Sequence, residues 1–273
     1  MDINQPDNNR SGRTPVIFLP GIIMPAALRY APLIRELGNS VRAVTKELEV
    51  YAGPTPPADH SIDVEVEGIS RAADAAGFER FHLYGHSGGG ACALAYVATN
   101  PERVLSLAVD EPATDFSAEQ RAQLQNKLQE IGQLPPSERT RDFLQWQLAP
   151  GVELPPPPPG PRPEWMVKRP AGINALMGAL LRYRLDVDRL RSFDRPVYYS
   201  YGSLSNPEWQ AMRDRLAAIF PRFTTELYEE ASHLDTSHQR EPARVAAALQ
   251  RLWQRAEIQG KIKAVGPRDA TTV

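Results

Sequence analysis

A serine enclosed by glycines, at the junction between a strand and a helix, constrains this chain more than any other feature. The apolar run RFHLY (80–84) leads into Gly85-His86-Ser87-Gly88-Gly89, and an alanine-rich run follows. Strand, sharp turn and helix form the context that a G-x-S-x-G motif requires. A residue on so tight a turn has strained backbone angles, so its neighbours must be small. The pattern predicts that Ser87 projects as a nucleophile; the alternative is a serine that only caps the helix.

Strand and helix patterns alternate around this motif. Strands are expected at 15–21, 41–51, 80–85, 103–110, 195–202 and 222–228, and helices at 25–37, 61–77, 88–99, 206–219 and 241–253. This alternation predicts an α/β fold, with a mostly parallel sheet of about six strands and helices on both faces. Strands buried on both faces explain why the apolar runs are continuous.

The alternation breaks between residues 113 and 194, where no strand pattern occurs. Ser117 and Gln120 form a capping-box pattern before a helix, further helices are expected at 137–148 and 173–183, and a proline-rich linker occupies 149–165. The segment therefore reads as a helical cap inserted after the strand that follows the Ser87 helix. The expected organisation is a core of residues 1–112 and 195–256, a cap of 113–194, and a flexible tail of 257–273.

Charge and cysteine content exclude several classes of protein. The 273 residues include 31 Lys and Arg against 33 Asp and Glu, and no basic patch suited to nucleic acid is evident. The chain has no run of 18 apolar residues, so no membrane-spanning helix is expected. The polar beginning of the chain does not resemble a signal peptide, and Cys92 as the single cysteine rules out an internal disulfide. We expect a cytoplasmic protein, monomeric or homodimeric, that binds a small molecule and neither nucleic acid nor membrane.

The motif and the element order resemble the α/β-hydrolase superfamily, in particular its lid-bearing esterase, haloperoxidase and dehalogenase-like group. The resemblance covers roughly residues 15–255 and implies that Ser87 is the nucleophile. The oxyanion turn, usually His-Gly in the family, falls on Pro20-Gly21-Ile22. Because a backbone amide supplies that hydrogen bond, Ile22 and Gly88 are the expected donors. About fourteen residues precede the first strand, so one or both of the family's two extra N-terminal strands are expected to be missing.

The resemblance also places a histidine between the last strand and the last helix, where a base for the serine is needed. The stretch LYEEASHLDTSHQREP offers two histidines there. His233 lies five residues after the expected end of the strand at Tyr228, where the family's histidine usually sits. His238 is closer to the helix and is expected to be a cap-region or surface residue.

The acid of the triad departs from the common pattern. The usual position reads GSLSNPEW, with Ser205 and Asn206 where the acid is expected. Some relatives carry the acid one strand earlier, and LAVDEPA offers Asp110 and Glu111 at that place. Because consecutive residues at a strand end point to opposite faces, only one is expected to reach the histidine. Glu111 is the predicted acid, and Asp110 is the alternative.

These residues predict a serine hydrolase that cleaves an ester of a hydrophobic small molecule without metal or cofactor. The predicted pocket residues are Met24, Phe116, Trp146, Leu176, Met177 and Leu180; any one of them could instead pack the cap onto the core. Lactone, thioester or carbon–carbon bond hydrolysis and perhydrolysis would use the same triad. A ligand-binding protein or receptor of this fold is a third hypothesis, since a fold alone does not decide function.

Overall fold

The computed structural model describes residues 12–114, 117–156, 160–161 and 163–265, and its centre is a six-stranded sheet. All pairings are parallel, in the order β2-β1-β3-β4-β5-β6. The strands are β1 (Thr14–Leu19), β2 (Val41–Thr45), β3 (Phe81–His86), β4 (Val104–Asp110), β5 (Val197–Gly202) and β6 (Phe223–Tyr228). The expected α/β fold with six parallel strands is confirmed.

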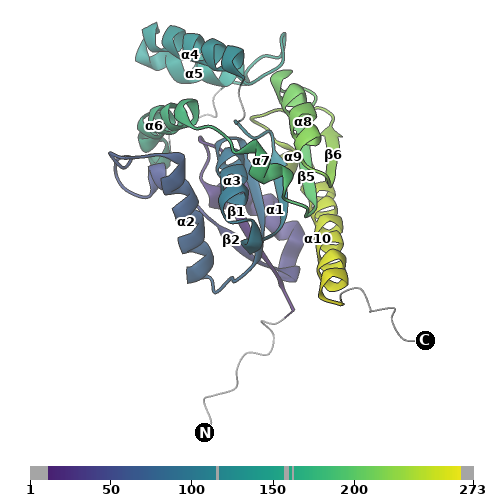
Figure 1. The fold of residues 1–273 in the computed structure, drawn as a ribbon. Coiled ribbons are helices and arrows are strands. Elements are labelled where there is room, and N and C mark those ends of the chain that lie inside the picture. Colours follow the sequence, from purple (N-terminus) through teal and green to yellow (C-terminus); the bar gives the residue numbers. More distant parts are fainter. Residues whose placement is uncertain (1–11, 115–116, 157–159, 162, 266–273) are drawn as a thin grey trace, which may run out of the picture.

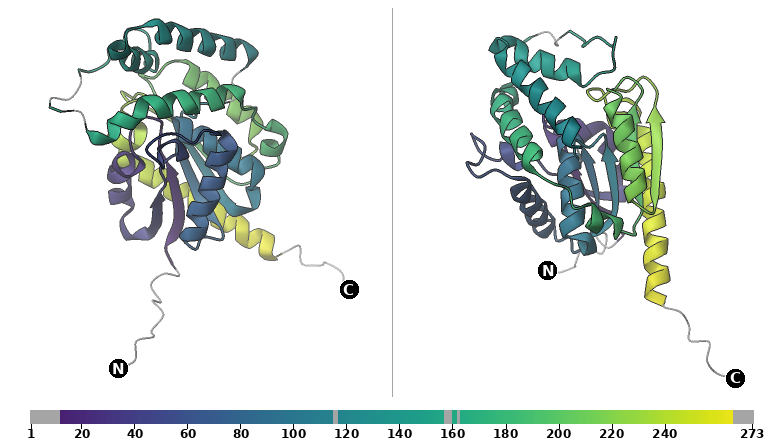
Figure 2. Two further views of the ribbon diagram at one scale, coloured as in Figure 1. Left: turned by 90° about the vertical axis from the view of Figure 1, so that its left-hand side faces the viewer. Right: turned by 45° about the horizontal axis from the view of Figure 1, so that its top comes forward.

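Helices cover both faces of this sheet (Figures 1 and 2). One face carries α1 (Ala26–Leu37) and α10 (Pro242–Val265), which pack against each other, and the short α9 (Ser237–Arg240) lies beside them. The other face carries α2 (Ile62–Ala75), α3 (Ser87–Thr99) and α8 (Glu208–Ile219). Because all six strands are parallel, their carboxyl ends lie at one edge of the sheet.

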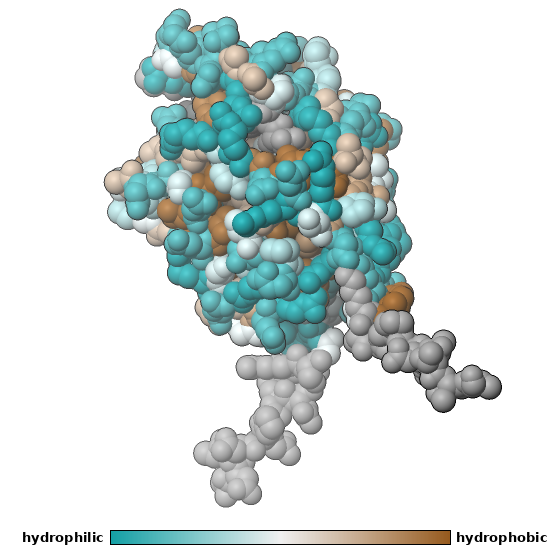
Figure 3. Space-filling model, in the orientation of Figure 1, coloured by the Kyte–Doolittle hydropathy of each residue, from teal (hydrophilic) through white to brown (hydrophobic). Residues whose placement is uncertain are grey.

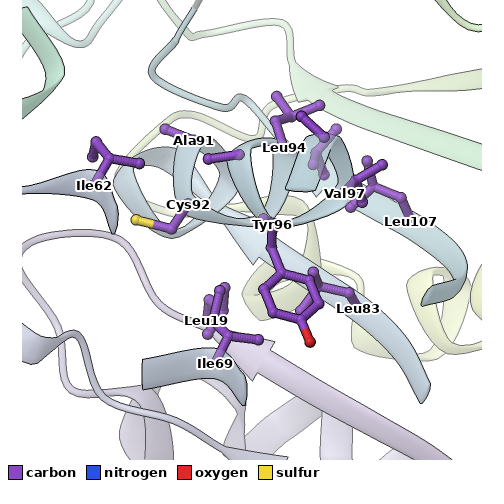
Figure 4. Close-up of a cluster of buried hydrophobic side chains, with 14 of the residues drawn as sticks. Leu19, Ile62, Ile69, Leu83, Ala91, Cys92, Leu94, Tyr96, Val97 and Leu107 are labelled. Atoms are coloured by element: carbon purple, nitrogen blue, oxygen red, sulfur yellow. The ribbon is translucent and has the colours of Figure 1, made fainter. Parts of the chain in front are cut away.

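The strands bury alternate side chains in two separate cores. In β1, Ile17 and Leu19 pack toward α2 and α3, whereas Val16 and Phe18 pack toward α1 and α10. Figure 4 shows the first core, in which Tyr96 on α3 and Leu19 lie among other apolar side chains. Fully burying one large apolar side chain stabilises a fold by about 1.5–3 kcal/mol. The two cores therefore stabilise the sheet from both faces.

Between β4 and β5 the described residues form four α-helices: α4 (Ala118–Gln133), α5 (Pro136–Trp146), α6 (Arg169–Arg182) and α7 (Val187–Arg191). We call residues 113–194 the inserted segment. Ser117 and Gln120 form the expected capping box at the start of α4. Helices α4, α5 and α6 lie across one end of the molecule (Figure 1), and they share a cavity with Ser87. The inserted segment therefore covers the carboxyl edge of the sheet near β3.

Two expectations from the sequence are wrong in detail. β2 ends at Thr45 instead of residue 51, because both carboxylate oxygens of Glu65 on α2 accept backbone N–H groups of Glu49 and Val50 and hold a 3₁₀ turn, η2 (Glu49–Tyr51). The chain from 257 to 265 is helical instead of a flexible tail. Good helix formers continue there, and Gln259 donates a hydrogen bond to the Asp194 carbonyl. The rest of the expected tail lies outside the described residues.

Candidate active site

Ser87 begins α3 directly after β3 and has a strained backbone. Its φ is +51°, a left-handed value that non-glycine residues rarely adopt. The turn requires glycine on both sides: a Cβ on Gly85 would lie 2.5 Å from the Gly89 carbonyl oxygen, and one on Gly89 would overlap the Pro20 carbonyl. The Gly89 amide donates a 3.1 Å hydrogen bond to that Pro20 carbonyl. The turn is thus fixed against the loop after β1, and strain of this kind is typical of functional sites.

Three side chains from three strand ends meet at this turn. Ser87 Oγ lies 2.9 Å from His233 Nε2, and His233 Nδ1 lies 2.7 Å from Glu111 Oε2. His233 is in the loop after β6, and Glu111 directly follows β4. All three residues are at least nine-tenths buried. Serine, imidazole and carboxylate in this order form the geometry that activates a hydroxyl as a nucleophile.

Glu111 is turned toward His233 by its own backbone. Its φ is +44°, also left-handed, and its amide donates a hydrogen bond to the Ser200 carbonyl on β5. Its second carboxylate oxygen, Oε1, accepts the Gly202 amide at 2.8 Å. Two contacts to β5 therefore hold the carboxylate while the other oxygen faces the histidine. Burial raises the pKa of Glu111 above its ordinary value, although the hydrogen bond and charge of His233 oppose that shift.

The loop after β5, where the family resemblance would place the acid, contacts the end of α5 instead. Asn206 Nδ2 donates to the Trp146 carbonyl at 2.9 Å, and the Asn206 amide donates to the Gln147 carbonyl. Leu148 and Ser205 form an isolated antiparallel bridge beside them. This loop after β5 is therefore an attachment point for the end of α5.

Asp110 lies next to Glu111 in the chain but belongs to another network. Asp110 Oδ2 lies 3.3 Å from His238 Nδ1 and accepts hydrogen bonds from Ser237 Oγ and, at 3.4 Å, from the Tyr84 hydroxyl. His238 Nε2 lies 2.9 Å from Thr236 Oγ1. The expectation of a cap-region or surface His238 is wrong, because the imidazole is fully buried between α1, β3 and α9.

The two networks differ in charge as well as in contacts. Burial would raise the pKa of Asp110, but the hydrogen bond and charge of His238, with Ser237, outweigh burial and lower it. Burial lowers the pKa of His238 against the opposing effect of Asp110. The guanidinium of Arg29, which is also buried and donates to Thr236, adds positive charge near the carboxylate. An ionised Asp110 is thus stabilised inside the protein.

A third imidazole lies between the two pairs. The ring of His86 is centred 4.9 Å from that of His233 and 5.6 Å from that of His238. Within the described residues neither of its nitrogens has a hydrogen-bond partner, and burial lowers its pKa well below the ordinary value. A Cβ on Gly21 would lie 2.5 Å from His86 Nδ1. His86 is therefore a neutral packing residue beneath the turn at Gly21 and Ile22.

A largely apolar cavity opens beside Ser87. Four of the six predicted pocket residues line it, namely Trp146, Leu176, Met177 and Leu180, and so do Ile22 and Gly88. Met24 is not among the lining residues; its sulfur accepts a hydrogen bond from Gln239. Phe116 lies outside the described residues. In the space-filling view, apolar surface gathers in the band beneath α4 and α5 (Figure 3).

Several lining residues were not predicted from the sequence, and Trp209 on α8 is the most informative of them. Its indole ring stacks on the His233 imidazole, with ring centres 4.4 Å apart and an angle of 3° between the planes. The other apolar residues missed are Ala113, Leu124, Phe143 and Met212, and polar side chains at the cavity include Gln120, Gln123, Asn206, Glu208 and Arg215. The only signal was the apolar stripe of the helices, which equally predicts ordinary packing.

Comparison with known proteins places the chain in a family. Its sequence matches the alpha/beta hydrolase family over residues 16–248, so the chain belongs to that family. A comparison with curated proteins gives no significant match.

Solved structures agree on the fold. A thermophilic esterase from Thermogutta terrifontis has a TM-score of 0.68 at 16% identity, covering 89% of this chain and 90% of its own. A hydrolase from Pseudomonas aeruginosa has a TM-score of 0.67 at 15% identity, covering 88% and 89%. A carboxylesterase from Bacillus subtilis has a TM-score of 0.62 at 18% identity, covering 90% and 84%. At these identities the likeness describes the fold.

The described part of the chain offers neither a membrane-spanning helix nor a cluster of metal ligands. None of the helices in that part is long and apolar enough to cross a lipid bilayer. The same residues contain no group of three or more histidine, cysteine, aspartate or glutamate side chains placed to bind a metal ion.

Proposed function

We propose that the protein is a serine hydrolase that cleaves carboxylic esters of hydrophobic small molecules through an acyl-enzyme. The observation that carries this proposal is the chain of contacts from Ser87 Oγ to His233 Nε2 at 2.9 Å and from His233 Nδ1 to Glu111 Oε2 at 2.7 Å. Family membership and the esterases among the structural neighbours support the reaction class. The apolar lining of the cavity supports a hydrophobic substrate.

The proposed reaction follows from these positions. His233 takes the proton of Ser87 Oγ as that oxygen attacks the ester carbonyl, and Glu111 stabilises the imidazolium. The amides of Ile22 and Gly88 are the proposed donors to the oxyanion. Gly88 lies in the first turn of α3, where backbone N–H groups have no partner within the helix and where the helix dipole favours negative charge.

The second half of the cycle uses the same residues. His233 gives its proton to the alcohol oxygen as the ester C–O bond breaks, and then takes a proton from a water that attacks the acyl carbonyl. It returns that proton to Ser87 Oγ as the bond between Ser87 and the acyl group breaks, which releases the acid product and restores the starting state. We propose the inserted segment as the cap of this site, since α4, α5 and α6 supply most of the apolar wall. Loss of one oxyanion donor should lower the rate by about 10²–10³-fold.

Intact-mass labelling with a fluorophosphonate tests the proposal. One adduct is expected on the wild type and none on Ser87→Ala. Ser106→Ala is a matched control, because Ser106 Oγ lies 2.7 Å from His82 Nδ1, so it is a second buried serine beside a histidine, but away from the cavity. That variant should be labelled like the wild type. A folded wild type that gains no adduct and hydrolyses no ester from a panel of p-nitrophenyl esters would contradict the proposal and favour a ligand-binding protein.

A further inference from the structure

Tyr51 lies between the proposed oxyanion turn and the inserted segment. Its hydroxyl donates a 2.7 Å hydrogen bond to the carbonyl of Ile22, and the whole residue is buried. Burial raises the pKa of Tyr51 well above its ordinary value, although the nearby charge of Arg169 opposes that shift. The hydroxyl therefore remains a donor at any pH used for an assay. The residue that supplies one proposed oxyanion donor is thus held through its carbonyl by a side chain from η2.

Helix α6 of the inserted segment covers the other side of Tyr51. The Arg169 guanidinium carbon lies 3.8 Å from the centre of the Tyr51 ring, a cation–π contact in a buried setting. Gly172, one turn further along, lets the helix approach, since a Cβ there would overlap the ring. Glu47 forms a 3.5 Å ion pair with Arg169, and Lys168 donates to the Gly53 carbonyl. The start of α6 is therefore fastened to residues 47–53.

The same helix reaches the second proposed donor. Leu176 is fully buried, and its Cδ2 would lie 2.8 Å from a Cβ placed on Gly88. Leu176 also lines the cavity, as do Met177 and Leu180 further along α6. Helix α6 is thus linked to both proposed oxyanion donors. Its Leu176 lies directly against Gly88, and its Arg169 contacts Tyr51, which in turn is hydrogen-bonded to Ile22.

We propose that Tyr51 is a positioning residue. Its hydrogen bond to the Ile22 carbonyl keeps the Ile22 amide oriented toward the oxyanion, and its contact with Arg169 makes that orientation depend on the position of α6. This inference rests on the proposed serine hydrolase function. Without the hydroxyl, the buried Ile22 carbonyl loses its donor, and a buried unpaired carbonyl is costly enough for a loop to shift. A displaced donor weakens transition-state binding more than substrate binding, so the turnover number should fall while KM stays nearly constant.

The test compares Tyr51→Phe with Tyr96→Phe. Tyr96 is also a buried tyrosine, and its hydroxyl accepts a hydrogen bond from Ser70 on α2. For Tyr51→Phe we expect kcat on p-nitrophenyl butyrate to fall about tenfold, well short of the loss for a deleted donor, and KM to stay within twofold. The inhibition constant of an alkyl trifluoromethyl ketone, whose serine adduct carries an oxyanion, should rise by the same factor. Tyr96→Phe should leave all three quantities unchanged.

A second variant tests the part played by α6. Arg169→Met keeps an unbranched side chain over the ring but removes the cation, and it should lower kcat in the same direction by about threefold. Because Tyr51 itself is intact in this variant, it also provides the decisive comparison if Tyr51→Phe does not fold. No change in kcat or in the ketone constant for Arg169→Met would then overturn the inference.

Failure of the inference and failure of the proposed function give different results. A wild type that is labelled at Ser87 and turns over, with Tyr51→Phe matching it in kcat and in ketone inhibition, overturns only the role of Tyr51. A raised KM with unchanged kcat also overturns it, because that pattern indicates an altered pocket. A wild type with neither label nor turnover overturns the proposed function, and the role of Tyr51 with it.

Discussion

Two histidine–carboxylate pairs lie side by side in this protein, and they have the same chemical groups in different surroundings. Glu111 and His233 contact Ser87 and the cavity, whereas Asp110 and His238 are enclosed by Tyr84, Ser237 and Thr236. The carboxylates are consecutive in the chain. Burial raises the pKa of Glu111, while the contacts of Asp110 lower its pKa despite burial. The comparison teaches that the surroundings of such a pair, not its composition, decide which pair is a candidate for catalysis.

Exchange of each histidine for glutamine should separate the two pairs most strongly. His233→Gln removes the proposed base, so kcat/KM for ester hydrolysis should fall by roughly 10⁴-fold or more, with little change in stability. His238→Gln leaves Asp110 without its imidazole, so the free energy of unfolding should fall by about 3 kcal/mol, with kcat/KM within tenfold of wild type. Steady-state kinetics and urea denaturation measure the two effects. A stable His238→Gln protein that has lost its activity would contradict the assignment of a structural role to Asp110 and His238.

Exchange of the carboxylates tests the same division from the other side. Glu111→Gln should lower kcat by roughly 10³–10⁴-fold, because an amide neither fixes the histidine tautomer nor stabilises the imidazolium. At neutral pH it should not destabilise the protein: burial disfavours the ionised form of Glu111, so its ionisation costs stability as pH rises.

Asp110→Asn is the matched variant, and the sign of its effect is opposite. The lowered pKa of Asp110 means that its ionised form stabilises the fold above the unfolded pKa, and that this contribution is lost as pH falls. Removing the charge should therefore destabilise the protein at neutral pH, by about 2–4 kcal/mol, with kcat within tenfold of wild type. Equal rate losses for the two variants would show that the networks act as one unit.

The sequence predicted the strand ends that carry this site, and the family resemblance favoured Glu111 and His233, but no local pattern separated the two pairs. Strand and helix patterns are local, so the six strands and the turn at Ser87 could be recognised. The choice between Asp110 and Glu111 depends on a left-handed backbone at Glu111 and on contacts with β5, which is about ninety residues away in the chain. The burial of His238 depends on α1 packing over α9, a contact across more than two hundred residues. No local pattern encodes either.

Glu65 is a third buried carboxylate. Unlike Asp110 and Glu111, it is hydrogen-bonded mainly to backbone amides and not to an imidazole. It accepts the N–H groups of Glu49 and Val50, while His60 Nε2 lies 3.7 Å away and Lys46 and the carboxylate of Glu49 are nearby charges. Burial raises the pKa of Glu65 from 4.5 to about 7. A raised pKa means that stability is highest below the unfolded pKa and is lost as pH rises through 7.

Glu65→Gln should therefore flatten the dependence of stability on pH. Relative to this variant, the wild type should lose roughly 2–3 kcal/mol of unfolding free energy between pH 5 and pH 8. Urea denaturation of both proteins across that range measures the difference, and the comparison cancels the titration of all other groups. Parallel curves would show that Glu65 is ionised at little cost, as Asp110 is expected to be.

The smallest expected effect concerns the aromatic ring that faces each histidine. Trp209 lies parallel to His233 at 4.4 Å, whereas Tyr30 is tilted and Tyr84 is edge-on to His238. A parallel indole face should stabilise the imidazolium that His233 forms in the proposed reaction, by about 0.5–2 kcal/mol. Trp209→Leu should therefore lower kcat about tenfold, and Trp209→Phe, which keeps an aromatic face, should recover most of the loss.

Trp253→Leu is the control, since Trp253 lies 5.4 Å from the ring of His82 on the far side of the sheet. It should cost stability, as truncation of a buried tryptophan does, and leave kcat unchanged. If Trp209→Phe is as slow as Trp209→Leu, the face of the ring is not what matters, and Trp209 acts only by filling space beside the proposed base, His233. If Phe restores kcat, the stacked ring belongs to the catalytic pair, and the two histidines differ in how they are charged during the reaction as well as in what they contact.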